Sequence, residues 1–189
     1  MGEHFEKDLI KAIQNNPQRF GELYDAYFDK IFRYVFHRVV VFELAKDITS
    51  ESFVKVYLNI GRFKWKQISI GSWIYRIANN EVNQYFRKKK YITRNFTELG
   101  INSIPDYPDP ATLEAEKVAA EKELENHNEF RNIQSILREL DIKYQEIISL
   151  KYFDSKSIKE ISEIVSKKEG TVKSLISRGL EKIRNKIKK

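Results

Sequence analysis

The sequence predicts an all-α protein made of two small helical domains joined by a flexible linker. Apolar residues recur with the helical period along most of the chain, and no alternation typical of strands persists. Glycine and proline are scarce, at 7 and 4 among 189 residues. An acidic, proline-containing segment separates two helical regions, which predicts domains at 1–92 and 113–189 with a linker at 93–112.

The N-terminal region contains four predicted helices, the first at about 4–15. Asn16 and Pro17 then start the second helix, because Asn is a good N-cap and Pro suits the first helical position. The second helix carries a dense aromatic and aliphatic face, typical of a core. Further helices are predicted at about 43–60 and 70–89. The 43–60 helix is predicted to point Leu44, Ile48, Phe53, Val56 and Tyr57 inward.

Basic and aromatic residues interleave in 62–94, where nine Lys and Arg residues stand against one acid. Basic side chains follow a phosphate backbone, and exposed aromatic rings stack on unpaired bases. Some of these rings belong to the core. Trp65 is the best candidate for exposure because Lys64 and Lys66 flank it in a predicted loop.

The linker and the residues after it are acidic, with eight acids and two lysines between Glu98 and Glu125. This charge does not favour nucleic acid, and a solvated linker is the commoner explanation. The pattern from about 113 to 138 is helical again, and an apolar face continues to Leu150. A polar break at 154–156 ends that face.

Residues 157–189 have the pattern of a helix-turn-helix with a basic tail. Ile158, Ile161, Ile164 and Val165 form one apolar face of a short helix, and a polar break follows. The buried side of the second, longer helix is predicted to contain Val172, Leu175, Ile176, Leu180, Ile183 and Ile187. Two short helices joined in this way place the second one in a DNA major groove.

The charge of this tail supports the same interpretation. Residues 167–189 contain nine Lys and Arg against two Glu, a net of +7 that equals the formal net charge of the whole chain. Lys173, Ser174, Ser177 and Arg178 avoid the apolar stripe and are expected to face outward together. The alternative is a solvated, lysine-rich surface helix.

Several classes of function lack their sequence signals. Cysteine is absent, no apolar run approaches 18 residues, and the first residues lack the pattern of a signal peptide. We find no phosphate loop, nucleophile elbow or HExxH motif, and the three histidines are far apart. The expectation is a cytoplasmic protein that is not an enzyme, with no catalytic residues, metal, cofactor or membrane insertion.

Four segments in order resemble a bacterial sigma factor of the extracytoplasmic-function class in the sigma-70 family. AKDITSESFVKVY at 45–57 is similar to the segment that docks on RNA polymerase, and SWIYRIANN at 72–80 resembles the helix beside the −10 reader. LREL at 137–140 and GTVKS at 170–174 are similar to the start and the recognition helix of region 4. Family region 3 is missing, as is usual in this class.

The resemblance implies a fold of region 2-like and region 4-like domains and a role in directing core RNA polymerase to promoters. The implied contacts to the duplex −35 element are Lys167, Lys168, Thr171, Lys173, Ser174, Ser177, Arg178 and Lys182. The implied contacts to the single-stranded −10 element are Lys64, Trp65, Lys66, Arg76, Asn79, Asn80, Asn83, Gln84, Arg87 and Lys88. The implied contacts to polymerase are Asp47, Ser50, Glu51, Phe53, Val54 and Lys55.

The implied partners are the β′ clamp helices and β flap of the polymerase, promoter DNA as duplex and single strand, and an anti-sigma factor. Leu175 stands where the family usually has Arg, and Gly179 where it has Ala, so the DNA sequence that is read stays open. Two alternatives remain at this point. One is a stand-alone helix-turn-helix regulator with an N-terminal partner-binding domain, and the other is an adaptor that binds only proteins.

Overall fold

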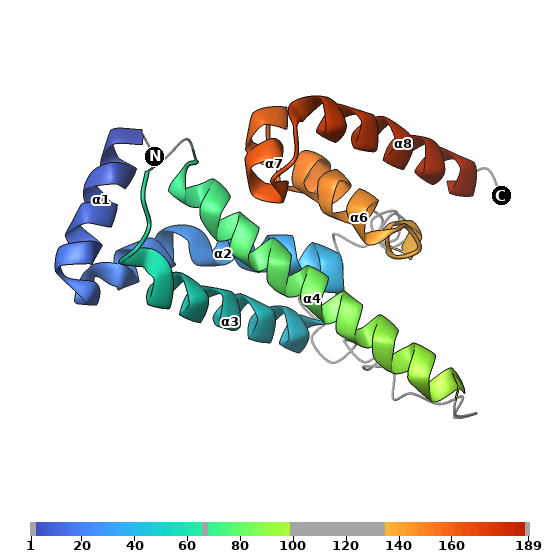
Figure 1. Ribbon diagram of the computed structural model, residues 1–189, viewed down its shortest axis with the longest axis horizontal. Coiled ribbons are helices and arrows are strands. Elements are labelled where there is room, and N and C mark those ends of the chain that lie inside the picture. Colours follow the sequence, from blue (N-terminus) through green and yellow to red (C-terminus); the bar gives the residue numbers. More distant parts are fainter. Residues whose placement is uncertain (1–2, 66–67, 99–134, 188–189) are drawn as a thin grey trace, which may run out of the picture.

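The computed structural model describes residues 3–65, 68–98 and 135–187, and every regular element in those ranges is helical (Figure 1). The N-terminal part contains α1 (Glu3–Asn15), η1 (Pro17–Arg19), α2 (Phe20–Val39), α3 (Phe42–Ile60) and α4 (Ile70–Glu98). The C-terminal part contains α6 (Ile142–Ile148), the π-helical turn η3 (Ser149–Phe153), α7 (Ile158–Val165) and α8 (Glu169–Ile187). The predicted all-α class is confirmed for these residues.

Local capping explains where two of the elements begin. The side chain of Asn16 accepts a hydrogen bond from the backbone N–H of Gln18 at 3.1 Å, and Pro17 occupies the first position of η1. The predicted cap is therefore present, but it starts the 3-10 helix η1, and α2 begins at Phe20. Ser157 and Glu160 form a capping box at the start of α7, in which each side chain bonds the other residue's backbone N–H. The capping box thereby fixes where the loop before α7 ends and the helix begins.

An aromatic ladder runs along α2 and receives the rings of Phe42 and Phe53 from α3. Tyr24 stacks on Phe28 with ring centroids 4.7 Å apart, and Phe32 and Phe36 continue the row. The Phe53 ring lies 4.9 Å from Tyr24 and 5.8 Å from Phe28. This packing joins α2 to α3 and leaves Phe53 only 3% exposed.

The two helical parts share one hydrophobic core. Buried residues of the N-terminal bundle cluster with Ile147, Leu150, Ile161, Ile164 and Val172 of the C-terminal part. Helix α4 lies between the α2–α3 pair and the C-terminal helices, and it contacts α7 and α6 (Figure 1). One long face of α4 therefore lies at the boundary between the two parts.

Several sequence expectations are corrected. Helix α4 continues to Glu98, beyond the predicted end near 89 and into the predicted linker. Tyr57 of α3 is 48% exposed, and Leu180 and Ile187 of α8 are 36% and 63% exposed, so these three do not lie inside. Leu180 follows Gly179, the residue of α8 that packs on Ile148, and Ile187 is the last residue of α8. The predicted helix after 112 and most of the predicted linker lie outside the described residues.

Candidate nucleic-acid interface

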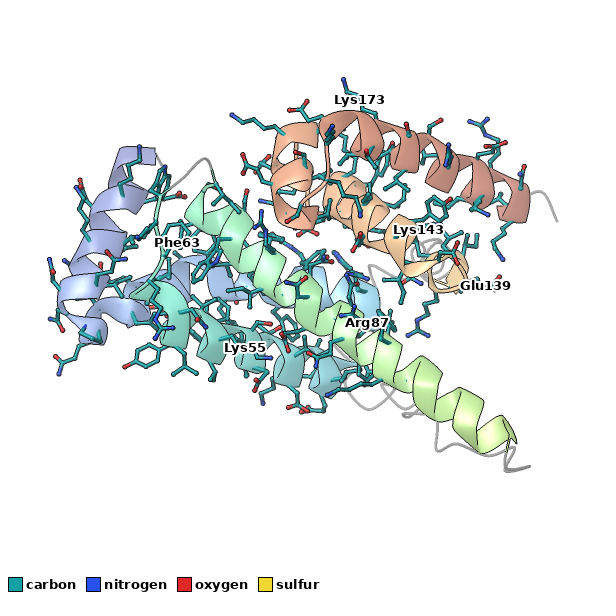
Figure 2. All side chains as sticks on the ribbon, viewed as in Figure 1. Lys55, Phe63, Arg87, Glu139, Lys143 and Lys173 are labelled. Carbon is teal, nitrogen blue, oxygen red and sulfur yellow. The ribbon has the colours of Figure 1, made fainter. Side chains whose placement is uncertain are left out.

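The outer face of α8 and the turn before it form an exposed, basic surface. All eight residues predicted to contact duplex DNA are exposed: Lys167, Lys168, Thr171, Lys173, Ser174, Ser177, Arg178 and Lys182. Figure 2 shows Lys173 pointing away from α6 and α7. The hydroxyl of Ser174 donates to the carbonyl of Gly170 at 3.0 Å, which leaves its oxygen free to accept. This surface presents cations and small polar groups together, as a major groove requires.

The inner face of α8 explains one unusual residue. A Cβ atom at Gly179 would lie 3.1 Å from Cγ1 and 3.2 Å from Cδ1 of the buried Ile148. Glycine therefore lets α8 approach α6 closely.

The turn that precedes α8 contains Ser166 in a left-handed conformation with φ 53°, and the N–H of Lys167 bonds the carbonyl of Ser162 at 3.1 Å.

A groove of about 660 Å³ lies between the end of α3, the loop that follows it and α4. Phe63 and Trp73, with ring centroids 4.8 Å apart, line it together with Lys64, Asn80 and Arg62. Asn80 and Lys64 were predicted to contact single-stranded DNA, whereas sequence reasoning did not assign Phe63 and Trp73 to such a pocket. The signal for them was the aromatic spacing within the basic segment.

Trp65 is less available than the sequence predicted. It is half-buried, its ring lies 6.1 Å from that of Phe63 in an edge contact, and Lys7 Nζ of α1 lies 5.2 Å from its centroid. Gln14 of α1 also donates to the carbonyl of Phe63 at 3.0 Å. Helix α1 thus positions this loop. Lys66 lies outside the described residues.

The predicted single-strand contacts of α4 fall into two stripes. The open stripe consists of the exposed residues Asn80, Gln84, Arg87 and Lys88. The covered stripe consists of Arg76, Asn79 and Asn83, which face the C-terminal helices and hydrogen bond to them. Asn79 is only 3% exposed. The structure therefore does not bring all these residues onto one accessible face.

The predicted polymerase-binding residues of α3 are also divided. Asp47, Ser50, Glu51 and Val54 are exposed, whereas Phe53 is buried in the aromatic ladder. Lys55 Nζ lies 2.6 Å from a carboxylate oxygen of Glu81, an ion pair that joins α3 to α4 and raises the pKa of Lys55. Sequence reasoning missed Leu58, which is 69% exposed beside Val54 and Tyr57.

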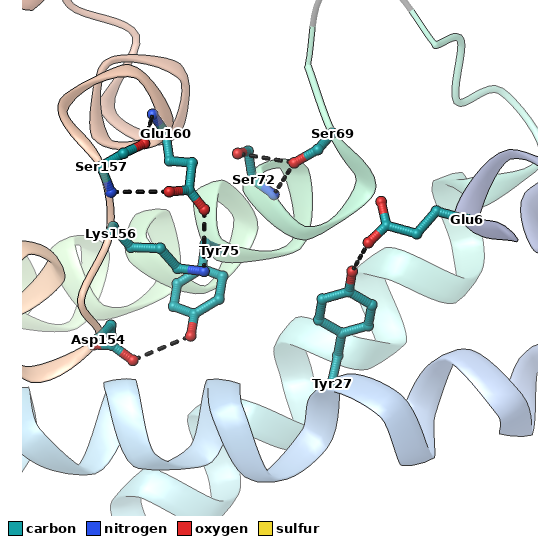
Figure 3. Close-up of polar contacts among 9 residues, drawn as sticks. All are labelled: Glu6, Tyr27, Ser69, Ser72, Tyr75, Asp154, Lys156, Ser157 and Glu160. Carbon is teal, nitrogen blue, oxygen red and sulfur yellow. Dashed lines mark hydrogen bonds and ion pairs between the residues drawn. The ribbon is translucent and has the colours of Figure 1, made fainter. Parts of the chain in front are cut away.

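A cavity of about 540 Å³ lies at the boundary between the two helical parts, and Figure 3 shows the polar contacts around it. Tyr75 donates its hydroxyl hydrogen to Asp154 at 3.1 Å, and Lys156 Nζ lies 4.3 Å from the Tyr75 ring. Burial raises the pKa of Asp154 to about 6, although Tyr75, Lys156 and Arg33 oppose the rise. Burial is the larger cause, and the charge of Arg33 the smaller, that lowers the pKa of His37 to about 4.

The helical bundle, the groove beside α4 and the exposed basic helix-turn-helix are features of a DNA-binding protein of the transcription machinery. Comparison with protein families shows the same two parts. Residues 23–91 match the model described as Sigma-70 region 2, and residues 130–183 match the model described as Sigma-70, region 4.

The sequence is 32% identical to the ECF RNA polymerase sigma factor SigW of Bacillus subtilis over 96% of both chains. It is 29% identical to the ECF RNA polymerase sigma factor BldN of Streptomyces coelicolor over 89% of this chain and 60% of that protein. This chain belongs to the ECF RNA polymerase sigma factors of the sigma-70 family. It is a transcription initiation factor that directs RNA polymerase to promoters, and a stand-alone regulator is not favoured.

Solved structures confirm the fold. CnrH in its complex with the cytosolic domain of CnrY has a TM-score of 0.69 at 16% identity, covering 97% of both chains. The sigma factor RpoE of Bartonella quintana, in complex with the anti-sigma factor NepR, has a TM-score of 0.64 at 16% identity, covering 89% of this chain and 96% of that one.

Proposed function

We propose a division of labour within this initiation factor. Helix α8 reads the −35 element as a duplex, α4 and its preceding loop capture the −10 non-template strand, and α3 docks on core RNA polymerase. The observation that carries the proposal is the exposed basic face of α8 behind a properly capped α7. We propose 1–92 and 113–189 as the two functional units, with α4 extending to Glu98 from the first.

At the −35 element, Lys173 and Arg178 are the residues that we expect to reach base edges. Arg and Lys pair with the O6 and N7 acceptors of guanine in the major groove. Lys167 and Lys168 lie in the turn and are exposed, so they are placed to contact phosphates. Phosphate contacts position the helix, and base contacts give it specificity.

At the −10 element, the groove beside α4 supports capture of an unstacked base. Phe63 and Trp73 supply aromatic walls, while Asn80 and Lys64 supply hydrogen-bond donors at the rim. Strand capture drives opening of the duplex without ATP, so this chain needs no active site of its own. None of the described helices is long and apolar enough to cross a membrane.

On the polymerase side, the exposed face of α3 supplies both charge and apolar surface. Val54, Tyr57 and Leu58 are 51%, 48% and 69% exposed, with Asp47 and Glu51 on the same helix. The partners that we propose for the chain are the β′ clamp helices at α3 and the β flap at the C-terminal helices. An anti-sigma factor that covers the α3 face is a further proposed partner, and all of these encounters take place in the cytoplasm.

In vitro transcription with purified core polymerase tests the whole assignment. The chain is expected to produce promoter-specific transcripts, and Leu58→Asp is expected to weaken core binding at least tenfold, about 1.4 kcal/mol. Lys11→Asp is the control, because Lys11 is exposed on α1, to which no polymerase contact is assigned. No core binding by the unaltered chain, or equal losses in both variants, would refute the assignment.

A further inference from the structure

The loop between α3 and α4 forms one wall of the groove beside α4. Arg62, Phe63 and Lys64 of this loop line the groove, and the Phe63 ring lies 4.8 Å from that of Trp73 in α4. The backbone N–H of Phe63 bonds the carbonyl of Ile60 at 3.1 Å, which continues the end of α3. This bond fixes only the start of the loop. The position of the Phe63 ring and of the residues that follow it depends on further contacts.

Gln14 of α1 holds this loop from the outside, where the loop runs beside α1 (Figure 1). Its side-chain Nε2 donates to the carbonyl of Ile60, the last residue of α3, and to the carbonyl of Phe63, both at 3.0 Å. An amide nitrogen carries two hydrogens, so one side chain serves both acceptors. Gln14 therefore ties the loop at the residue whose ring forms the wall of the groove.

Lys7 makes a second contact from α1 to the same loop. It precedes Gln14 by seven residues, or about two helical turns, so the two side chains lie on one side of the helix. Lys7 Nζ lies 5.2 Å from the centroid of the Trp65 ring, a distance at which a cation is attracted to an aromatic face. Trp65 meets Phe63 edge to face at 6.1 Å. Contacts thus run from α1 through Trp65 and Phe63 to Trp73.

The apolar face of α1 is anchored in the core. Leu9, Ile10 and Ile13 are 5%, 5% and 1% exposed and belong to the main hydrophobic cluster. This burial fixes α1 against the bundle, so that the polar side chains beside this face have a rigid support. The region 2 model matches residues 23–91, so α1 precedes the matched segment. The contacts between α1 and the loop are therefore a feature of this chain that the family match does not cover.

Capture of an unstacked base depends on how well the loop is held beforehand. A loop that becomes ordered only on binding loses affinity by the entropy of ordering it, whereas a loop that is already held does not. Stacking on two aromatic walls also requires that the walls keep a fixed separation. Both requirements are met here by side chains of α1.

We propose that α1 is a positioning element of the groove: Gln14, through two hydrogen bonds, and Lys7, through Trp65, hold the loop so that Phe63 faces Trp73 before DNA arrives. This inference rests on the proposed role of the groove in capturing the −10 strand. Gln14 is a positioning residue, because it acts on the strand only through the loop.

A neutral substitution of Gln14 tests the proposal. Gln14→Met removes both donors but keeps an unbranched side chain of good helix propensity. The chain assembled with core polymerase is expected to bind the −10 non-template oligonucleotide of a promoter that it transcribes about fivefold more weakly, as measured by fluorescence anisotropy. Gln18→Met is the matched control, because Gln18 is exposed in η1 and contributes its backbone N–H to the Asn16 cap. The control should bind as the unaltered chain does.

Tryptophan fluorescence reports the position of the loop directly. The chain contains two tryptophans, and both belong to this arrangement: Trp65 in the loop and Trp73 in the groove. Acrylamide is expected to quench the fluorescence of Gln14→Met more strongly than that of the unaltered chain or of Gln18→Met. Circular dichroism melting checks that each variant is folded. A loss of affinity that is equal in the two variants overturns the proposal.

A third variant separates this proposal from the proposed function. Phe63→Ala removes one wall of the groove and is expected to weaken oligonucleotide binding more than Gln14→Met does. If Phe63→Ala binds normally, then the role of the groove in strand capture is wrong, and quenching alone judges whether α1 holds the loop. If Phe63→Ala binds weakly but Gln14→Met leaves either quenching or affinity unchanged, then positioning by α1 is wrong and strand capture by the groove stands.

Discussion

Helices α8 and α4 carry the two sets of predicted DNA contacts, and the two helices differ in how far these residues are exposed. All the predicted contacts on α8 are exposed; the Ser174 hydroxyl bonds the Gly170 carbonyl of the same helix, and Lys182 Nζ lies 5.6 Å from the centroid of the Tyr144 ring in α6. On α4, Asn80, Gln84, Arg87 and Lys88 are exposed, but Arg76, Asn79 and Asn83 bond to the C-terminal helices. One contact surface lies on the outside of the fold, and half of the other lies inside it.

This difference has a physical origin in what each helix packs against. Helix α8 covers α6 and α7 with its apolar side only, and Gly179 lets it approach Ile148 closely. Helix α4 is covered on both sides, by α2 and α3 and by α6 and α7. A helix between two layers keeps few exposed positions. The predicted duplex contacts are therefore exposed however the two parts are arranged, and half of the predicted single-strand contacts are not.

The largest expected effect on stability comes from removing the charge of Arg38, which bonds Asn79 and Asn83 of the covered stripe from α2. Arg38→Met leaves the Glu146 carboxylate buried without its compensating cation, which is expected to cost about 3–5 kcal/mol in the free energy of unfolding. Urea denaturation of the full chain measures this cost. An equivalent truncation on the open surface, Arg178→Ala, is expected to change stability by less than about 0.5 kcal/mol.

The double variant Arg38→Met/Glu146→Met provides the control for that experiment. It removes both buried charges, so it should recover most of the stability that the single variant loses. Additive losses would show that Arg38 and Glu146 are not coupled through Asn79 and Asn83. The difference between α4 and α8 would then reflect only how deeply their residues are buried, without a coupled pair of charges.

The sequence predicted the helices and the exposed face of α8 well, because both follow from apolar periodicity. In 158–187 the stripe that contains Ile161, Ile164 and Val172 is buried, and Lys173 and Arg178 point away from it. Periodicity overestimated the inner face at Leu180 and Ile187. Gly179 and Ile183 on either side of Leu180 pack against the C-terminal core, so Leu180 lies at the edge of the buried stripe, whereas Ile187 is the last residue of α8.

The contacts between the two parts were not predicted. Periodicity places a residue on a face but does not say which distant face will cover it. Arg38 and Glu146 are charged residues within otherwise apolar faces, and Glu146 precedes the buried pair Ile147 and Ile148. Such a charge within an apolar run signals a buried polar network, but its partner in a distant helix cannot be identified from one sequence. Asn79 was predicted to contact DNA because its hydrogen bond to Glu146 in a distant helix cannot be inferred from one sequence.

A smaller effect is expected on the open side of the comparison. Lys173→Ala or Arg178→Ala should each cost about 1–3 kcal/mol in binding a duplex −35 element, concentrated at one base-pair position. Gel-shift titrations against single-base variants of the element measure it. A uniform loss over all sequences would show phosphate contacts instead of base contacts.

The smallest expected effect concerns pH at the boundary between the two parts. Burial raises the pKa of Asp154 to about 6 from 3.8, so its neutral form is favoured in the folded chain. Its contribution to stability is fully present below the unfolded pKa of 3.8 and is lost as the pH rises through 6. Asp154→Asn keeps an acceptor for Tyr75 and stays neutral at every pH. The variant should therefore gain stability over the unaltered chain as the pH rises.

Between about pH 5 and about pH 7.5 this gain should grow by roughly 1.4 kcal/mol, which urea denaturation at the two pH values can measure. His37 changes the stability with pH in the opposite direction. Burial and Arg33 lower the pKa of His37 from 6.5 to about 4, so acidification favours the unfolded chain at this residue. His37 is present in both proteins, so its contribution cancels in the difference. A gain that is the same at both pH values would mean that Asp154 is solvated and that the two parts are separated in solution. The difference in exposure between the covered stripe of α4 and the outer face of α8 would then apply only to a minor state of the chain in solution.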